Sequence, residues 1–385
     1  MKKVIKKAAA VFLALTMAMS LASCQVNEKE WAYKVGDTEV PAGVYRIFQL
    51  EAFTAAKGLV EDSSKSLFEQ QIEGKDAADW INDTVDEHIR TCMAAEAELK
   101  EMGLIPLSQE DQNAIESSAK ASWDPETTST LTAKSVYGPY GVGYDSFKQY
   151  IYYNGLVSLL LEARYGENGT EPISDVDLAN YLLDNYYAAH MCYYSVTSTE
   201  TNATVVADAY NNYVEEYNEG NVTWEDIRES EQYRTDSVNT SPVQENVIFP
   251  KEDAENTMPE TLRLGFDNTE PGKAFTTSDE GILYFFVTFN QDQAMEYVTT
   301  QRSQFLSEFK GEEIYAEMTQ KSEEMGIERN DSLIKKYDLK QLEKDVNKNT
   351  SKAAQSRQEQ SIAPASSGTV IESSSPASAG ESAAS

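Results

Sequence analysis

The chain has 385 residues, with 64 acidic and 32 basic side chains, a net charge of −32 and only two histidines. A surface this acidic repels phosphate backbones and anionic headgroups, which argues against a nucleic-acid partner and against electrostatic binding to a membrane. The three cysteines and two histidines are too few and too widely spaced for a disulfide framework or a zinc cluster, so we expect no metal and no cofactor.

The first residues have the layout of a secretory signal. Four lysines precede an apolar stretch from Ala8 to Met19, and small residues follow before Cys24. The ending "LASC" resembles a bacterial lipobox, in which cleavage leaves the cysteine N-terminal and diacylated. We predict a signal peptide over residues 1–23 and a lipid anchor on Cys24, with an ordinary secretory signal as the alternative. Export would remove the four lysines and lower the net charge from −32 to −36.

Residues 24–171 are predicted to form a mainly helical domain. The segment "WAYKVGDTEV" alternates around a Gly36-Asp37 turn and predicts a hairpin, and the next segment predicts a helix that ends at Gly58. Apolar residues recur at helical spacing between residues 76 and 102, which places Cys92 on the buried stripe and His88 on a face of that helix. The most apolar helix, "SFKQYIYYNGLVSLLLEARYG", has a run of only about ten apolar or aromatic residues, broken by Asn154 and Gly155, which argues for a core helix over a membrane span.

Residues 172–295 are predicted to form one compact α+β domain. Ser174 is placed to cap a short helix, and "AAHMCYYSV" then predicts a strand through its aromatic and β-favouring residues. A helix over residues 203–218, a short "NVIF" strand and a helix over residues 258–266 follow. The continuous apolar run "GILYFFVTF" has the length of a strand and predicts the centre of a sheet.

Residues 296–346 are predicted to be helical again and to complete the N-terminal domain. Residues 347–385 contain almost no large apolar side chains, so they cannot build a core and are predicted to be disordered. The 22 tyrosines have two interpretations, which are amphipathic packing at element edges and a soluble surface that binds peptides.

Segments spread over most of the chain resemble successive parts of one kind of protein. "YKVGDTEVPAGVYRIF" and "AEAELKEMGL" resemble an opening hairpin with its helix and the end of a long second helix. "ISDVDLANYLLDNYYAAHMCYYSV" resembles the entry to a parvulin-type prolyl isomerase domain, and "MPETLRLGF" with "EPGKAFTTSDEGILYFFVTF" resembles its closing helix, turn and last strand. The ordered series resembles the SurA/PrsA-type extracytoplasmic foldases. This resemblance implies a SurA-N-like helical chaperone domain, built from N- and C-terminal segments, with an inserted parvulin-like domain.

The resemblance also implies a degenerate site. Parvulin-type domains carry two histidines on neighbouring central strands, an Asp or Cys beside them, and a Gly-Gly-x-Leu-Gly loop. The first histidine is His190, but the second falls at about Leu283 and "YRTDSVNTSPVQENVIF" replaces the loop. Strand alternation puts His190 and Cys192 on one face, so these are the candidate catalytic residues. The candidate substrate-binding residues, which periodicity alone assigns to the core, are Met258, Leu262 and Phe266.

His190 therefore has three interpretations, which are a core histidine beside a buried thiol, a residue of a surviving isomerase site, and a pH sensor. Whether the protein is an enzyme stays open at this stage. The first functional hypothesis is a lipid-anchored chaperone outside the cytoplasmic membrane that binds unfolded or nascent secreted polypeptides, with isomerase activity weak or lost. The second is an active prolyl isomerase that uses His190.

The third hypothesis is a solute-binding lipoprotein of a transporter. Such proteins need two α/β lobes with repeated β-α units. Packing of the N-terminal helices against residues 296–345 would argue against it.

Overall fold

The computed structural model describes residues 27–124, 132–196, 201–235 and 243–362. The predicted signal peptide, Cys24 and the last part of the predicted tail lie outside these ranges. The protein is of the α+β class, with many helices and small antiparallel sheets. It divides into two compact units. The first unit consists of three segments, which are the chain up to Asp86, Gln109–Ile151 and the chain from Glu328 onward. The second unit consists of Glu87–Ser108 and Tyr152–Ile327. The predicted domain limits stay predictions.

The first unit begins with the predicted hairpin. Strands β1 (Trp31–Val35) and β2 (Thr38–Pro41) are antiparallel around a turn in which Gly36 has a φ of +55°, a conformation that favours glycine. The remaining elements, in chain order, are α2 (Ala42–Leu59), η1 (Leu67–Glu69), β3 (Gln71–Ile72), β4 (Lys75–Asp76), the first part of α3 (Ala77–Glu101), α4 (Gln109–Trp123), α5 (Ala133–Tyr137), η2 (Gly138–Tyr140), the first part of α6 (Tyr144–Tyr165), β9 (Glu328–Arg329), α14 (Asp331–Ile334) and α15 (Leu339–Ile362).

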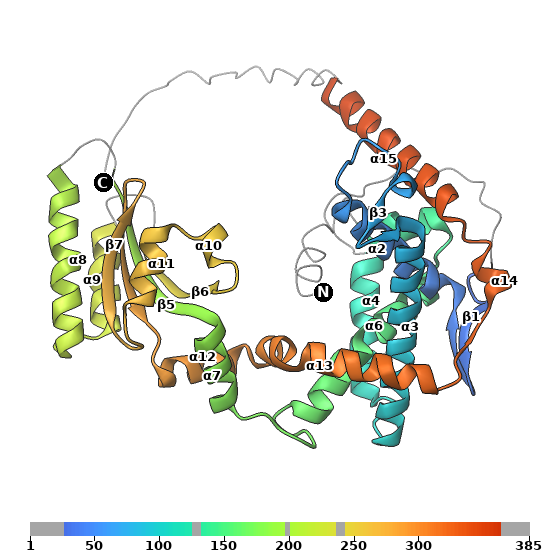
Figure 1. Cartoon of the computed structure of the whole chain (residues 1–385), viewed down its shortest axis with the longest axis horizontal. Helices are drawn as coiled ribbons and strands as arrows, with labels where there is room; N and C mark the ends of the chain where they lie inside the picture. The colour runs from blue at the N-terminus through green and yellow to red at the C-terminus, as the bar shows by residue number, and fades with distance from the viewer. Residues whose placement is uncertain (1–26, 125–131, 197–200, 236–242, 363–385) are drawn as a thin grey trace, which may run out of the picture. The chain divides into compact units, whose positions relative to one another are not determined.

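The C-terminal segment closes this unit. Strand β9 pairs antiparallel with β1, and the backbone N–H of Asn330 donates to the carbonyl of Ala32 at 2.8 Å. Glu343 on α15 accepts hydrogen bonds from the Ser66 hydroxyl and the Leu67 N–H, both at 3.0 Å. Residues far apart in sequence therefore share one core, as Figure 1 shows for α2 and the C-terminal elements.

Helix α15 extends to Ile362, whereas the sequence predicted that the disordered tail begins at residue 347. The physical reason is that the added residues are rich in alanine, lysine and glutamine, which favour a helix without supplying an apolar face. A segment that cannot contribute to a core can therefore still form a helix.

None of the helices in the described ranges has the length and apolar character that a bilayer span requires.

The second unit contains a four-stranded antiparallel sheet in the order β6-β5-β8-β7. Its elements are the rest of α3 and α6, α7 (Asp175–Asn185), β5 (Tyr186–Ser195), α8 (Thr201–Glu219), α9 (Trp224–Thr235), β6 (Val243–Pro250), α10 (Ala254–Thr257), α11 (Glu260–Asp267), β7 (Ala274–Asp279), β8 (Ile282–Thr288), α12 (Gln291–Thr300) and α13 (Arg302–Glu324). The apolar run predicted at the centre of a sheet is the interior strand β8. Strand β7 was not predicted, and it joins β8 through a two-residue turn at Glu280 and Gly281, both with positive φ.

The helix predicted over residues 258–266 is α11, which begins two residues later than expected, at Glu260. Met258 is extended and Pro259 is the N-cap of α11, and the separate short helix α10, which was not predicted, precedes them. A proline disfavours the helical conformation of the residue before it and cannot donate within a helix, so α10 ends here.

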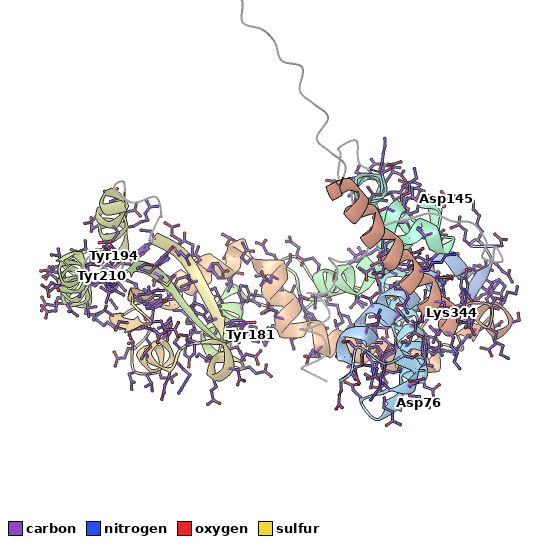
Figure 2. The ribbon with its side chains drawn as sticks, turned by 90° about the horizontal axis from the view of Figure 1, so that it is seen from above. Asp76, Asp145, Tyr181, Tyr194, Tyr210 and Lys344 are labelled. Atoms are coloured by element: carbon purple, nitrogen blue, oxygen red, sulfur yellow. The ribbon has the colours of Figure 1, made fainter. Side chains whose placement is uncertain are left out.

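Helices cover both faces of the sheet. Figure 1 shows α8 and α9 on one side of the strands and α10 and α11 on the other. On the first side, Tyr210 of α8 is fully buried and Tyr194 of β5 packs against the same cluster, and Figure 2 shows these two side chains close together. On the second side, Phe286 is the fully buried centre of an aromatic group. Each such phenylalanine contributes about 1.5–3 kcal/mol by burial.

An ion-pair network joins the helices of the second unit. Arg164 of α6 bonds Glu98 of α3 at 2.8 Å and also Glu317 of α13, and Lys321 bonds Glu98 at 2.5 Å. Hydroxyls of Thr91 and Thr319 lie 2.8 Å apart beside it. Because Arg164 is only 13% exposed, these pairs are screened less than ordinary surface pairs.

The first unit holds a buried carboxyl group with aromatic partners. Glu51 of α2 accepts hydrogen bonds from the hydroxyls of Tyr150, at 2.5 Å, and Tyr137, at 3.4 Å. Burial raises the pKa of Glu51 to about 7, against the lowering effect of these two hydrogen bonds. Between pH 4.5 and about 7, the Glu51 carboxyl group therefore keeps its proton in the native state and releases it in the unfolded chain.

We predict that Glu51→Gln removes a pH dependence of stability. Because the pKa of Glu51 rises from 4.5 to about 7 on folding, the wild-type free energy of unfolding should fall as pH increases between these values. The variant should therefore gain about 2 kcal/mol over the wild type between pH 5 and pH 8. Urea unfolding at both pH values measures this, with the exposed Glu69→Gln as control. Equal pH dependence in Glu51→Gln and wild type would contradict the prediction.

Candidate functional site

Strand β5 divides the candidate site residues between two faces of the sheet. Ala189 and Met191 pack against α10 and α11, in one cluster with Met258, Leu262 and Phe266. His190 and Cys192 point to the opposite face, where α8 and α9 lie. His190 and Cys192 therefore lie on the same face of the sheet, as predicted. The three candidate substrate-binding residues lie on the opposite face, so the structure does not bring the two groups together. Those three side chains are 6–8% exposed and belong to the core.

His190 lies between two aromatic rings. Its imidazole stacks on the Trp224 indole with a centroid distance of 4.8 Å and an interplanar angle of 9°, and the Phe289 ring lies 4.9 Å away. Its Nδ1 atom is buried and, among the described residues, has no hydrogen-bond partner. Burial lowers the pKa of His190 to about 4, although Glu245 opposes this. His190 is therefore neutral between pH 5 and 8, the range that the pH-sensing interpretation needs.

A bulge in β6 lies opposite His190. Ala189 pairs with Val247 and Met191 pairs with Gln244, so two residues of β6, Glu245 and Asn246, face a single residue of β5. Asn246 has a φ of +57°, in the left-handed region that asparagine tolerates. This irregularity brings the Glu245 carboxylate into the electrostatic surroundings of the imidazole.

Cys192 carries a buried thiol with no exposed surface. It packs with Val206, Tyr210 and Phe285 between the sheet and α8. A reactive cysteine must be accessible and favoured as thiolate, and an apolar enclosure provides neither condition. Cys192 therefore acts as a small core residue in this structure.

The position expected for a second histidine is distant from the first. Leu283 pairs with Tyr194, whereas His190 pairs with Val287. Four residues along a strand correspond to about 13 Å. The Cys192–Phe285 pair lies between them. A histidine at residue 283 would consequently not contact His190, and most of the segment that replaces the Gly-rich loop lies outside the described residues.

Local sequence signals fix the position of Trp224 at the start of α9. Helix α8 ends at Gly220, whose φ is +80°, with the Asn221 N–H bonded to the Glu216 carbonyl at 2.8 Å. The Thr223 hydroxyl then accepts from the Asp226 N–H at 3.2 Å while the Asp226 carboxylate accepts from the Thr223 N–H at 2.9 Å. This reciprocal capping box begins α9 at Trp224.

An open depression of about 470 Å³ lies beside Trp224. It is lined by Tyr217, Gly220, Val222, Thr223, Trp224, Glu225, Gly272 and Gln293. None of these was a candidate site residue in the sequence. The resemblance to parvulin-type domains did predict a helix start at "VTWEDI", and the Thr-x-x-Asp spacing there is its capping signal. Trp224 thus has one ring face on His190 and contributes to a depression open to solvent.

The other histidine has different neighbours. His88 on α3 stacks on Tyr315 of α13, with 3.4 Å between its Nδ1 atom and the tyrosine hydroxyl, and burial lowers its pKa to about 4. This agrees with the prediction that His88 lies on a helix face. In the part of the chain that the structure describes, no cluster of His, Cys, Asp and Glu side chains has the arrangement of a metal site.

No family model and no curated protein matches the chain. Among solved structures, PrsA from Bacillus subtilis is 13% identical with a TM-score of 0.26, and the match covers 67% of this chain and 89% of that one. The foldase protein PrsA from Streptococcus pneumoniae is 12% identical with a TM-score of 0.25, covering 62% of this chain and 84% of that one.

We predict that His190→Phe keeps the stack on Trp224 and weakens the acid sensitivity of stability. The pKa of His190 falls from 6.5 to about 4 on folding. As the pH falls from 6.5 toward 4, the imidazole therefore binds a proton in the unfolded chain but not in the native state, and the wild type loses stability. The loss between pH 7.5 and 4.5 should be smaller in the variant by about 1–2 kcal/mol. Urea unfolding followed by circular dichroism tests this. An unchanged acid loss would show that His190 is not protonated on unfolding.

Proposed function

We propose that the protein is a lipid-anchored chaperone outside the cytoplasmic membrane, which holds unfolded secreted polypeptides. The observation that carries this proposal is the closure of the N-terminal helical unit by the returning segment after Glu328. This is the plan implied by the resemblance to SurA/PrsA-type foldases, in which an α+β domain is inserted into a helical domain. The lipid on Cys24 and the extracytoplasmic location are parts of the proposal that rest on the "LASC" signal.

The overall charge supports a holding function. The chain carries twice as many acidic as basic residues, so copies repel one another and remain dispersed while apolar clients are bound. Holding requires no catalytic group. The buried state of His190 and Cys192 therefore does not weigh against this function.

A solute-binding role is less well supported. Every strand pair in the described residues is antiparallel, and repeated β-α units with parallel strands do not occur there. Glu343, Asn330 and the β9 strand also tie the C-terminal segment to the N-terminal region. Two α/β lobes around a cleft are not compatible with this arrangement.

The isomerase alternative requires His190 to face an apolar proline pocket. The apolar candidates, Met258 and its neighbours on α11, pack on the opposite face of the sheet. The sheet itself separates the two groups, so a local side-chain movement cannot unite them. We therefore assign the parvulin-like sheet a structural role within the chaperone.

We predict that the mature chain suppresses aggregation of a reduced, unfolded client at a near-stoichiometric ratio. Cys24→Ser keeps the unlipidated protein in solution, and light scattering of the client measures suppression. Serum albumin at equal concentration is the control for non-specific crowding. No suppression at molar excess would overturn the proposed function.

We predict no catalysis of prolyl isomerisation that depends on His190. A chymotrypsin-coupled assay on an Xaa-Pro peptide should give the same rate with wild type, with His190→Ala and without protein. The uncatalysed barrier is about 18–20 kcal/mol, so even weak catalysis is measurable above background. A rate enhancement that vanishes in His190→Ala would restore the isomerase alternative.

A further inference from the structure

The depression beside Trp224 has the side chains that recognise a long cationic side chain. Trp224 and Tyr217 offer aromatic surface, Val222 offers apolar surface, and Glu225 is the charged lining residue. Lysine and arginine bury aliphatic stems on apolar surface while the charged group remains near water, an aromatic face or a carboxylate. The lining provides all of these partners within one depression.

The lining is held in place by its own contacts. Gln293 lines the depression together with Tyr217, and the Gln293 side chain accepts from the Asn290 N–H at 2.9 Å in the capping box of α12. Trp224 is held from behind by the parallel imidazole of His190. A rigid aromatic surface loses little conformational entropy when it binds a ligand.

The surrounding charge favours a cationic ligand. Residues 203–231 contain eight carboxylates and one arginine. Arg228 bonds both Glu225 and Glu245, so these three side chains carry one net negative charge. The Glu225 side chain is still 57% exposed and can accept further hydrogen bonds. Lys273, which follows the lining residue Gly272 in the chain, donates to the Asn218 carbonyl at 3.0 Å.

An anionic ligand at the start of α9 is not supported. Helix N-termini attract anions through free N–H groups. Here the Thr223 hydroxyl accepts from the Asp226 N–H, and the Glu225 and Asp226 carboxylates already place negative charge in the first turn of α9. The local chemistry therefore selects positive rather than negative ligands.

We propose that the depression formed by Tyr217, Val222, Trp224 and Glu225 binds lysine- or arginine-bearing segments of unfolded polypeptides, with His190 as the residue that positions Trp224. This inference rests on the proposed chaperone function and assigns it a binding site. The aromatic rings contact the aliphatic stem, and Glu225 with the adjacent acidic surface attracts the charged end.

The test measures binding of short fluorescent peptides to the full mature chain carrying Cys24→Ser. One peptide contains glycine, serine, leucine and two lysines, and its counterpart has glutamine in place of both lysines. Glu225→Gln should weaken the lysine peptide about fivefold and leave the glutamine peptide unchanged. Glu229→Gln, which makes the same charge change on the same helix outside the lining, should leave both unchanged.

Trp224→Leu and His190→Ala provide the second pair of measurements. Trp224→Leu keeps an apolar side chain but removes the aromatic face, so the lysine peptide should bind about threefold more weakly. His190→Ala should weaken it similarly, whereas His190→Phe, which keeps a ring behind Trp224, should restore wild-type affinity. Circular dichroism and thermal unfolding of each variant establish that it is folded.

The outcomes separate the binding site from the chaperone function. If the wild type suppresses client aggregation but Glu225→Gln and Trp224→Leu bind the lysine peptide as tightly as wild type, the site is overturned and the function stands. Equal weakening by Glu229→Gln would also overturn the site, because it would indicate diffuse attraction to acidic surface. Failure of the wild type to suppress aggregation would overturn the proposed function, whereas suppression without binding of the lysine peptide would overturn the site alone.

Discussion

The two-residue period of strand β5 is the constraint on which the second unit depends. Each side chain of an interior strand can point to only one face, so neighbours in sequence enter different cores. Ala189 and Met191 contribute to the core under α10 and α11, while His190 and Cys192 contribute to the one under α8 and α9. A displacement by one residue would exchange the two sets and bury an imidazole among the phenylalanines around Phe286.

This division changes what His190 can do. A histidine that serves proton transfer needs a partner for each ring nitrogen and a pKa near the working pH. His190 instead has a buried Nδ1 atom, a pKa near 4 and a stacked indole. Its physical contribution is a flat neutral surface. Of the three interpretations that the sequence left open, these surroundings favour a core histidine.

The sequence predicts those features that depend on local pattern. The apolar run of β8 identified an interior strand, Ser174 marked the start of α7, and alternation correctly placed His190 and Cys192 on one face. Non-local packing could not be predicted in the same way. Nothing in the period of Met258, Leu262 and Phe266 tells which face of the sheet their helix covers, and the Trp224 stack joins segments that the chain brings together only on folding.

The distribution of charge and aromatic rings suggests how an acidic protein can bind without aggregating. Most of the large aromatic surface of the second unit is enclosed, as Phe285 and Phe286 illustrate. Trp224 and Tyr217 remain half-buried at a depression bordered by carboxylates. Under the proposed function, these carboxylates would repel other copies of the chain and attract a cationic unfolded segment. Weak binding of this kind permits release, because each contact is partly exposed and contributes little alone.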